Sequence, residues 1–280
     1  MPRFRRRSSP SPSREPVLST PRRPEFSGDL MWCDFVTALS FLTLLHVPSM
    51  TGREPTPVSL ARSFSFFPLV GFLLGGGSWG LALLLARTTP PFLLACILTL
   101  YSVLVTRAFH MDGLADFWDG LGGGYNPDRR LEIMKDSRTG AFGAVALSLA
   151  VALKIAALHA LLTHRLGSPL LIVPAFSRLA MVLTAYKTPY ARKEGGLGKP
   201  FLEHMSAREL RIALGICLLL SAVVNPFFTL LCAATVLVFS RVMKRGCRKW
   251  FGGVTGDVLG AVNEMTEILL YALGAMVLAS

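Results

Sequence analysis

Long stretches without a charged residue are the feature that most limits what this chain can fold into. Residues 63–86, 88–106 and 212–240 contain no Asp, Glu, Lys or Arg. An α-helix needs about 20 mostly apolar residues to cross a bilayer core of about 30 Å, and these stretches approach or reach that length. They do not alternate apolar and polar positions, as membrane β-strands do. The sequence therefore predicts an all-α integral membrane protein.

The rest of the composition agrees, because 16% of the residues are charged, against about 25% in ordinary soluble domains. Three further segments are nearly as apolar, with few interruptions: 139–163 by Lys154, 166–186 by Arg178, and 258–279 by Glu264 and Glu267. An ionisable group inside a membrane helix is costly to desolvate and is by default functional. Arg178 is therefore a candidate functional residue, whereas no motif surrounds Lys154 and its role stays open.

The number of crossings follows from the apolar runs and the breaks between them. The run 212–240 is longer than one crossing needs, and Asn225-Pro226 lies near its middle; proline cannot continue a helix, so we divide the run there. Residues 32–50 are predicted to be a re-entrant or interfacial helix, with an ordinary crossing as the alternative. About seven transmembrane helices are predicted after it, at 64–86, 91–108, 140–163, 168–187, 210–224, 226–242 and 258–279.

Alternate crossings place the long polar loops together. Loops 52–63, 109–139, 188–209 and 243–257 share one side. With residues at the helix ends assigned to the nearest loop, they carry 18 Lys and Arg residues, whereas the short connections on the other side carry two, Arg87 and Arg165. Cytoplasmic loops are enriched in Lys and Arg. The polar loops are therefore predicted to face the cytoplasm.

The first 30 residues differ from the rest, since they are rich in Arg, Ser and Pro and have too few apolar residues for a core. We expect residues 1–30 to be a disordered basic tail that lies near anionic lipid; a transit peptide is the alternative. Residues 31–280 are predicted to form one polytopic membrane domain.

Three aspartates stand close together in HMDGLADFWDGLGGG, residues 110–124. On a helix that turns about 100° per residue, Asp112, Asp116 and Asp119 fall within an arc of about 60° and share a face. Neighbouring carboxylates repel one another unless a positive charge lies among them. Mg²⁺ is commonly held by carboxylates together with substrate phosphates. The pattern thus favours a Mg²⁺ site for a diphosphate, over a solvated acidic face or helix-capping aspartates.

Two more polar segments accompany these aspartates. MKDSRTGAFG, residues 134–143, brings Lys135, Asp136, Ser137 and Arg138 to the start of the next apolar segment; Lys and Arg can neutralise phosphoryl oxygens, although a basic cluster at a membrane boundary has the same composition. GGVTGDVLGAVNEMTE, residues 252–267, places Asn263 and Glu264 in a predicted membrane helix and Asp257 at its entrance. Packing explains such residues poorly.

The ordered motifs resemble a known family. FHMDGLADFWDGLGGG and MKDSRTGAFG, together with FLTLLHVP (41–48), RSFSFFPLVGFLLG (62–75), PAFSR (174–178), YARKEGGLG (190–198) and GGVTGDVLGAVNE (252–264), resemble the cobalamin synthases. These are the adenosylcobinamide-GDP ribazoletransferases, and the resemblance covers residues 32–279. It implies a Mg²⁺-dependent inner-membrane enzyme that joins adenosylcobinamide-GDP to α-ribazole, or to α-ribazole 5′-phosphate, and releases GMP.

The resemblance also suggests roles for the candidate residues. Asp112, Asp116 and Asp119 would bind Mg²⁺, and one of them would accept the proton of the nucleophile. Lys135 and Arg138 would hold the diphosphate, beside Asp136 and Ser137. Arg178 and Arg192 are the next candidates for contact with a phosphate or the leaving group. The roles suggested for Asp257, Asn263 and Glu264 are to complete the metal shell or to contact a polar edge of a substrate.

Other classes of protein fit less well. CDP-alcohol phosphotransferases carry an Arg where this chain has Asp116, and a transporter is expected to show internal repeats, which the sequence lacks. Nucleic acid is not an expected partner, because the net charge of +12 follows the loops and the tail. The sequence leaves open whether the protein is a monomer or a homo-oligomer.

Overall fold

The computed structural model describes residues 28–45, 47, 56–196 and 198–278, and the predicted tail lies outside them apart from its last three residues. Over these residues the chain is helical, with one isolated parallel β-bridge between Tyr190 and Val254. The helices are α1 (Gly28–Leu42), α2 (Pro57–Ser63), the 3₁₀ helix η1 (Phe64–Phe66), α3 (Phe67–Leu85), α4 (Pro91–Val105), α5 (Phe109–Gly123), α6 (Pro127–Ile133), α7 (Ala141–Thr163), α8 (Ser168–Ala185), α9 (Lys199–Glu203), α10 (Ala207–Val224), α11 (Pro226–Phe251) and α12 (Gly256–Leu278).

Prolines and capping side chains set several helix boundaries. The predicted break at Asn225-Pro226 is confirmed, since α10 ends at Val224 and α11 begins at Pro226. The Asn225 side chain accepts a hydrogen bond from Phe228 N at 3.0 Å, which satisfies a free N–H at the start of α11, and proline there has no N–H to satisfy. At its other end α10 begins with a capping box between Ser206 and Glu209.

The helices are those of a multi-pass membrane protein, although the predicted number of seven crossings is not confirmed. Among the described residues, five helical segments are long and apolar enough to cross a membrane: Pro57–Leu85, Ala141–Thr163, Ser168–Ala185, Pro226–Phe251 and Gly256–Leu278. The pair α4 and α5 counts as a sixth only if it forms one span with an 89° bend. Helix α10 is not among them, because its first turns carry charge. In the described part of the N-terminal region, Leu30–Leu42 is a shorter apolar helix, and its re-entrant placement stays a prediction.

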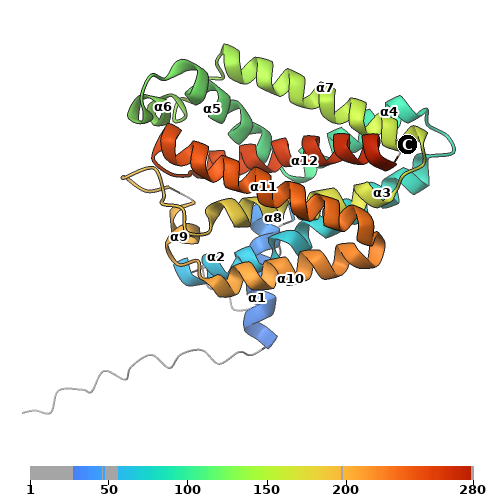
Figure 1. Ribbon diagram of the computed structural model, residues 1–280, viewed down its shortest axis with the longest axis horizontal. Helices are drawn as coiled ribbons and strands as arrows, with labels where there is room; N and C mark the ends of the chain where they lie inside the picture. Colours follow the sequence, from blue (N-terminus) through green and yellow to red (C-terminus); the bar gives the residue numbers. More distant parts are fainter. Residues whose placement is uncertain (1–27, 46, 48–55, 197, 279–280) are drawn as a thin grey trace, which may run out of the picture.

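Helix α8 lies at the centre of the bundle and packs against α3, α10, α11 and α12 (Figure 1). Two glycines allow the close approach of α3, because a Cβ at Gly71 would overlap the carbonyl group of Pro174 and a Cβ at Gly75 would overlap that of Leu170. Almost all of the α8 surface is buried, whereas α7 and α11 expose large apolar side chains outward. Helix α8 therefore forms the core and α7 and α11 form part of its apolar exterior.

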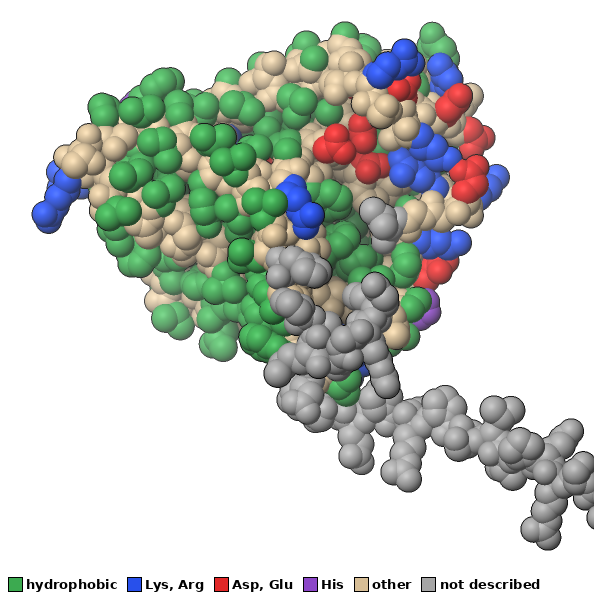
Figure 2. Space-filling view, turned by 180° about the vertical axis from the view of Figure 1, so that it is seen from behind, with side chains coloured by type: hydrophobic (Ala, Val, Ile, Leu, Met, Phe, Trp, Pro, Cys, Tyr) green, Lys and Arg blue, Asp and Glu red, His purple; other side chains and the backbone are tan. Residues whose placement is uncertain are grey.

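The polar loops gather at one end of the bundle, as the sequence predicts. The bridge between Tyr190 and Val254 joins the loop after α8 to the loop after α11, and Arg130 of α6 donates to the Trp250 carbonyl oxygen at 3.1 Å. Figure 2 shows acidic and basic side chains concentrated at one end of the face in view, with a largely hydrophobic surface elsewhere. This end of the molecule carries the candidate site.

Candidate functional site

A sharp bend before α5 sets the direction of the helix that carries the three aspartates. Arg107 and Ala108 both adopt left-handed backbone conformations, with φ of 54° and 55°, which are unfavourable for residues other than glycine. The Arg107 guanidinium donates to the carbonyl oxygen of Thr43 at 2.9 Å, and Leu44 N donates to the Val105 carbonyl oxygen at 2.7 Å. The end of α1 therefore holds the bend in place.

The three aspartates of α5 have different surroundings. Asp112 is exposed, Asp116 is half-buried, and Asp119 is 7% exposed. The Asp119 carboxylate accepts hydrogen bonds from Gly140 N at 2.7 Å and from Gly143 N at 2.8 Å. It thus satisfies free N–H groups at the start of α7 and favourably places a negative charge at that helix N-terminus. Asp119 anchors α7, using one lone pair on each of its oxygens.

Two glycines bring the other aspartates of α5 against the start of α12. A Cβ at Gly113 would lie 2.7 Å from the Asp257 carbonyl oxygen, and a Cβ at Gly260 would lie 3.3 Å from the His110 backbone. The close packing of the two helices places Asp112 and Asp116 within electrostatic range of the Asp257 carboxylate. Asp112, Asp116 and Asp257 therefore lie near one another, and Asp119 also lies within electrostatic range of Asp116.

Arg192 is the cation beside this cluster. Its guanidinium forms an ion pair with Asp257 at 2.7 Å and donates to the Met134 carbonyl oxygen at 3.3 Å. The β-bridge positions it, because Ala191 N donates to the Val254 carbonyl oxygen at 2.9 Å. Gly253 permits that contact, since a Cβ there would lie 3.0 Å from the Pro189 carbonyl carbon.

The types and charges of the side chains at this site suit a divalent cation. Asp112, Asp116 and Asp257 bring three carboxyl groups near the guanidinium of Arg192. Carboxylate oxygens are the donors that Mg²⁺ prefers, and a cation would relieve their mutual repulsion. Within the described ranges, no three His, Cys, Asp or Glu side chains are already arranged to hold a metal ion. The residues fit Mg²⁺ in type and charge, with some side-chain rearrangement.

The basic loop after α6 lies beside an open cavity of about 850 Å³. Lys135 forms an ion pair with Glu194, which lowers the pKa of the Glu194 carboxyl. Hydrogen bonds from the Arg138 side chain and backbone lower the pKa of Asp136 to about 2. Ser137 is exposed. Asp136 therefore orients Arg138 toward solvent, and neither basic side chain is committed to a buried partner.

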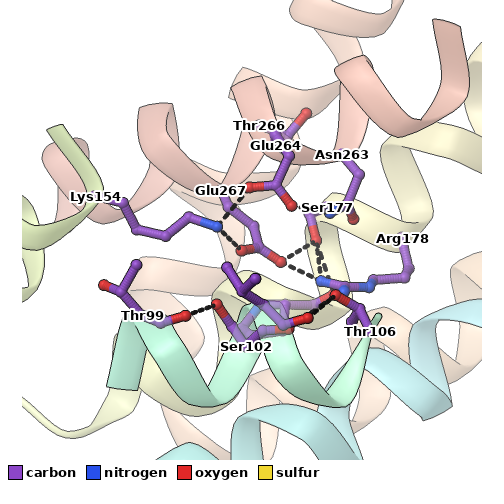
Figure 3. Close-up of polar contacts among 12 residues, drawn as sticks. Thr99, Ser102, Thr106, Lys154, Ser177, Arg178, Asn263, Glu264, Thr266 and Glu267 are labelled. Atoms are coloured by element: carbon purple, nitrogen blue, oxygen red, sulfur yellow. Dashed lines mark hydrogen bonds and ion pairs between the residues drawn. The ribbon is translucent and has the colours of Figure 1, made fainter. Parts of the chain in front are cut away.

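Three predicted site residues lie elsewhere, in a buried network of charges within the bundle (Figure 3). Lys154 of α7 contacts Glu264 at 2.6 Å and Glu267 at 2.8 Å, both on α12. Glu267 also pairs with Arg178 of α8 and accepts from Ser177 at 3.3 Å. Helix α4 borders the adjoining cavity through Ser102. Helix α5 is also near, since its fully buried His110 lies within electrostatic range of Glu267.

This network changes the interpretation of Arg178, Asn263 and Glu264. All three are under 5% exposed, and Asn263 donates to Glu264 at 3.3 Å. The adjoining cavity, lined by Lys154, Arg178 and Glu267, has a volume of about 20 Å³, room for about one water molecule. These side chains face one another in the bundle interior rather than the polar end.

Sequence reasoning did not identify two participants. Glu267 is the acid that contacts both Lys154 and Arg178, and Glu194 is the partner of Lys135. A usable signal existed for Glu267: two acids in one apolar segment matched two isolated cations in two others, and buried charges are usually paired. Glu194 lies in a polar loop, where an acid has no distinguishing pattern.

Comparison with known proteins places the chain among enzymes of one kind. It matches the model of the cobalamin-5-phosphate synthase family over residues 34–275. A relative from Syntrophobacter fumaroxidans is 56% identical over 249 residues, covering 88% of this chain and 99% of the relative. Relatives from Pseudomonas putida (40% over 235 residues, 84% of this chain and 95% of the relative) and Chlorobium chlorochromatii (37% over 251 residues, 87% and 96%) are similar over nearly their whole length. All three are named adenosylcobinamide-GDP ribazoletransferase.

No solved structure matches this chain. The family match covers most of the helical bundle and all of the residues at its polar end, from α5 to the start of α12. The chain belongs to the cobalamin-5-phosphate synthase family.

Proposed function

We propose that this chain is a Mg²⁺-dependent adenosylcobinamide-GDP ribazoletransferase. A hydroxyl oxygen of α-ribazole attacks the cobinamide-side phosphorus of the diphosphate and forms a new P–O bond. The bond from that phosphorus to the bridging oxygen breaks, its electron pair leaves with GMP, and the hydroxyl proton passes to a base. α-Ribazole 5′-phosphate undergoes the same transfer and gives the 5′-phosphate of the product.

The observation that carries this proposal is the cluster of carboxyl groups where α5 meets α12. Asp112 and Asp116 face Asp257 at the polar end, with Arg192 as the neighbouring cation. When bound, Mg²⁺ supplies positive charge that stabilises the negative charge developing on the phosphoryl oxygens. Asp112 and Asp116 would hold it together with Asp257, and Asp119 could add a ligand through the lone pairs left by its bonds to α7.

The chain's own cations position the substrate. Arg192 lies beside the acids and next to the loop that carries Lys135 and Arg138. Bidentate contacts from the two arginines to phosphate oxygens would fix the diphosphate in line with the attacking hydroxyl. The exposed Asp112 carboxylate is the best placed of the acids to accept the hydroxyl proton, because it has no hydrogen bond to another described residue.

The buried residues Arg178, Asn263 and Glu264 act differently in this proposal. They hold α7, α8 and α12 together inside the bundle and so position Asp257, one heptad before Glu264, rather than touch the substrate. The polar end faces the cytoplasm of a bacterial inner membrane, in agreement with the distribution of Lys and Arg among the loops.

The proposal is tested by following GMP release from adenosylcobinamide-GDP with the protein in membranes or detergent. Separate reactions contain α-ribazole or α-ribazole 5′-phosphate, with Mg²⁺ or with EDTA. We expect product with Mg²⁺ and none after chelation. Asp112→Asn should lower kcat by at least about a hundredfold, whereas Glu203→Gln, which neutralises an exposed acid of α9, should leave it unchanged. No Mg²⁺-dependent GMP release from folded protein would exclude the proposal.

A further inference from the structure

Helix α11 has a continuous outward-facing apolar stripe. Phe227, Leu230, Val238 and Val242 are 60%, 72%, 62% and 56% exposed, and their spacing of three or four residues, continued by the exposed Ala234, places them on one face of the helix. In a multi-pass membrane protein, such a stripe contacts the acyl chains of the lipid. Figure 1 shows α11 running along the near face of the bundle.

The same face becomes cationic at the C-terminal end of α11. Arg245 lies three residues after Val242, and Lys249 lies seven residues after Val242. Arg241 lies one turn before Arg245. The side chains of Arg241, Arg245 and Lys249 are all exposed. Arg245 follows Phe227 by 18 residues, which corresponds to a rise of about 27 Å at about 1.5 Å per residue. The hydrocarbon core of a bilayer is about 30 Å thick. The cationic face therefore begins where lipid headgroups begin.

This positive charge is not balanced within the described part of the protein. Helix α11 contains no Asp or Glu, and none of the ion pairs among described residues includes its cations. Lys244 lies within electrostatic range of Arg241, Arg248 and Lys187, all of like charge. The result is a crowded group of cations without an acidic partner.

Two of these cations already have a structural role, which separates them from the outward face. Lys244 donates to the Tyr186 carbonyl oxygen, and Arg248 donates to the Lys187 carbonyl oxygen at 2.6 Å. Both cap the end of α8, where cations are favourable. Arg245 and Lys249 form no described hydrogen bond through their side chains, and the Arg241 side chain donates only to its own helix, at 3.4 Å.

We propose that Arg241, Arg245 and Lys249 form a binding site for the headgroup of an anionic phospholipid. The phosphate of the lipid lies against the three cations, and its acyl chains run along Val242, Val238 and the apolar stripe beyond them. Continuity with that stripe favours a lipid over a soluble phosphate, because a soluble anion gains nothing from the apolar side chains. An anionic headgroup also offsets the repulsion among the crowded cations.

Native mass spectrometry of the detergent-purified full chain tests the site. The chain is titrated with dioleoyl-phosphatidylglycerol and, separately, with dioleoyl-phosphatidylcholine. We expect selective binding of the anionic lipid, weakened in high salt, and about thirtyfold weaker binding of that lipid by the double variant Arg245→Gln/Lys249→Gln. The control Arg87→Gln/Arg165→Gln removes the same charge from two exposed positions that follow the C-terminal ends of α3 and α7. This control should bind the anionic lipid as the unmodified chain does.

The controls give the outcomes that decide the proposal. Equal binding of the two lipids, or equal weakening by the two double variants, would show that net charge rather than this site attracts lipid and would overturn it. Displacement of the anionic lipid by millimolar inorganic phosphate or GMP would indicate a site for soluble anions and would also overturn it. Thermal unfolding of each variant in the same detergent establishes that reduced binding is measured on folded protein.

Discussion

Asp112 and Asp119 lie seven residues apart on one helix, yet their carboxylates have different surroundings. Asp112 is exposed, whereas both oxygens of Asp119 accept N–H groups at the start of α7. Gly140 and Gly143 leave room for that carboxylate, because a Cβ on either would lie 2.9–3.0 Å from its Cγ atom. The DGLADFWD pattern therefore combines a surface acid with a structural one.

Asp119→Asn separates these roles. An amide has one acceptor oxygen, so one of the two N–H groups loses its carboxylate partner, and we expect a loss of about 1–3 kcal/mol in the free energy of unfolding. Asp112→Asn should leave stability unchanged and remove activity instead. Thermal unfolding in detergent, beside the GMP-release assay, checks both. Equal melting temperatures for the two variants would argue against the capping role of Asp119.

At the level of the helices, Gly113 controls how closely α5 approaches α12. In Gly113→Ala the new Cβ would lie 2.7 Å from the Asp257 carbonyl oxygen and 3.0 Å from its Cα atom, so α12 must move away from Asp112 and Asp116. A displacement of about 1 Å at an active site can lower the rate by about a hundredfold. We expect kcat to fall by at least about tenfold, measured by GMP release.

A matched substitution shows whether the effect belongs to this contact. Gly215 in α10 is exposed and has no other atom within 4 Å of an added Cβ, so Gly215→Ala should raise stability by about 0.5–1 kcal/mol and preserve activity. If both alanine variants turned over substrate at the normal rate, close packing of α5 on α12 would not be required for the reaction.

The buried charges connect α7, α8 and α12 as a unit with no net charge: Lys154 and Arg178 oppose Glu264 and Glu267. Removing one member leaves an uncompensated charge, which in a protein interior costs about 3–5 kcal/mol. We expect that loss for Lys154→Met. The double variant Lys154→Met/Glu264→Gln restores neutrality and should recover most of it. Unfolding midpoints of the single and double variants measure the recovery, and additive losses would contradict a charge-balanced network.

Some of this element-level structure could be predicted from the sequence. The uncharged runs predicted apolar helices, and Asn225-Pro226 predicted the division between α10 and α11, because both signals are local in sequence. The bend before α5 could not be predicted: Arg107 and Ala108 carry no glycine or proline signal, and their left-handed conformations depend on contacts with the end of α1. The matched charges of the apolar segments indicated that ion pairs form, but they could not show which residues pair, since 110 residues separate Lys154 from Glu264.

For the molecule as a whole, the candidate site depends on loops that are distant in sequence meeting at one end. Alternate crossings predicted that loops 109–139, 188–209 and 243–257 lie on one side. In the structure, hydrogen bonds from Arg192 and Arg130 join these loops. The membership of the acid cluster was less predictable. Helical spacing grouped Asp119 with Asp112 and Asp116, but it could not show that the Asp119 carboxylate would accept two N–H groups at the start of α7.

The orientation of the bundle in the membrane gives the last prediction. Lys193 lies at the polar end and Arg165 in the short connection between α7 and α8; both side chains are exposed. Because Lys and Arg are concentrated in the polar-end loops, those loops should remain in the cytoplasm. In a variant without the half-buried Cys33 and Cys96, a membrane-impermeant maleimide should label Arg165→Cys in bacterial cells whose outer membrane has been removed. Lys193→Cys should react only after the inner membrane is permeabilised. The reverse pattern would place the acid cluster outside the cell, away from a cytoplasmic supply of the nucleotide-linked substrate.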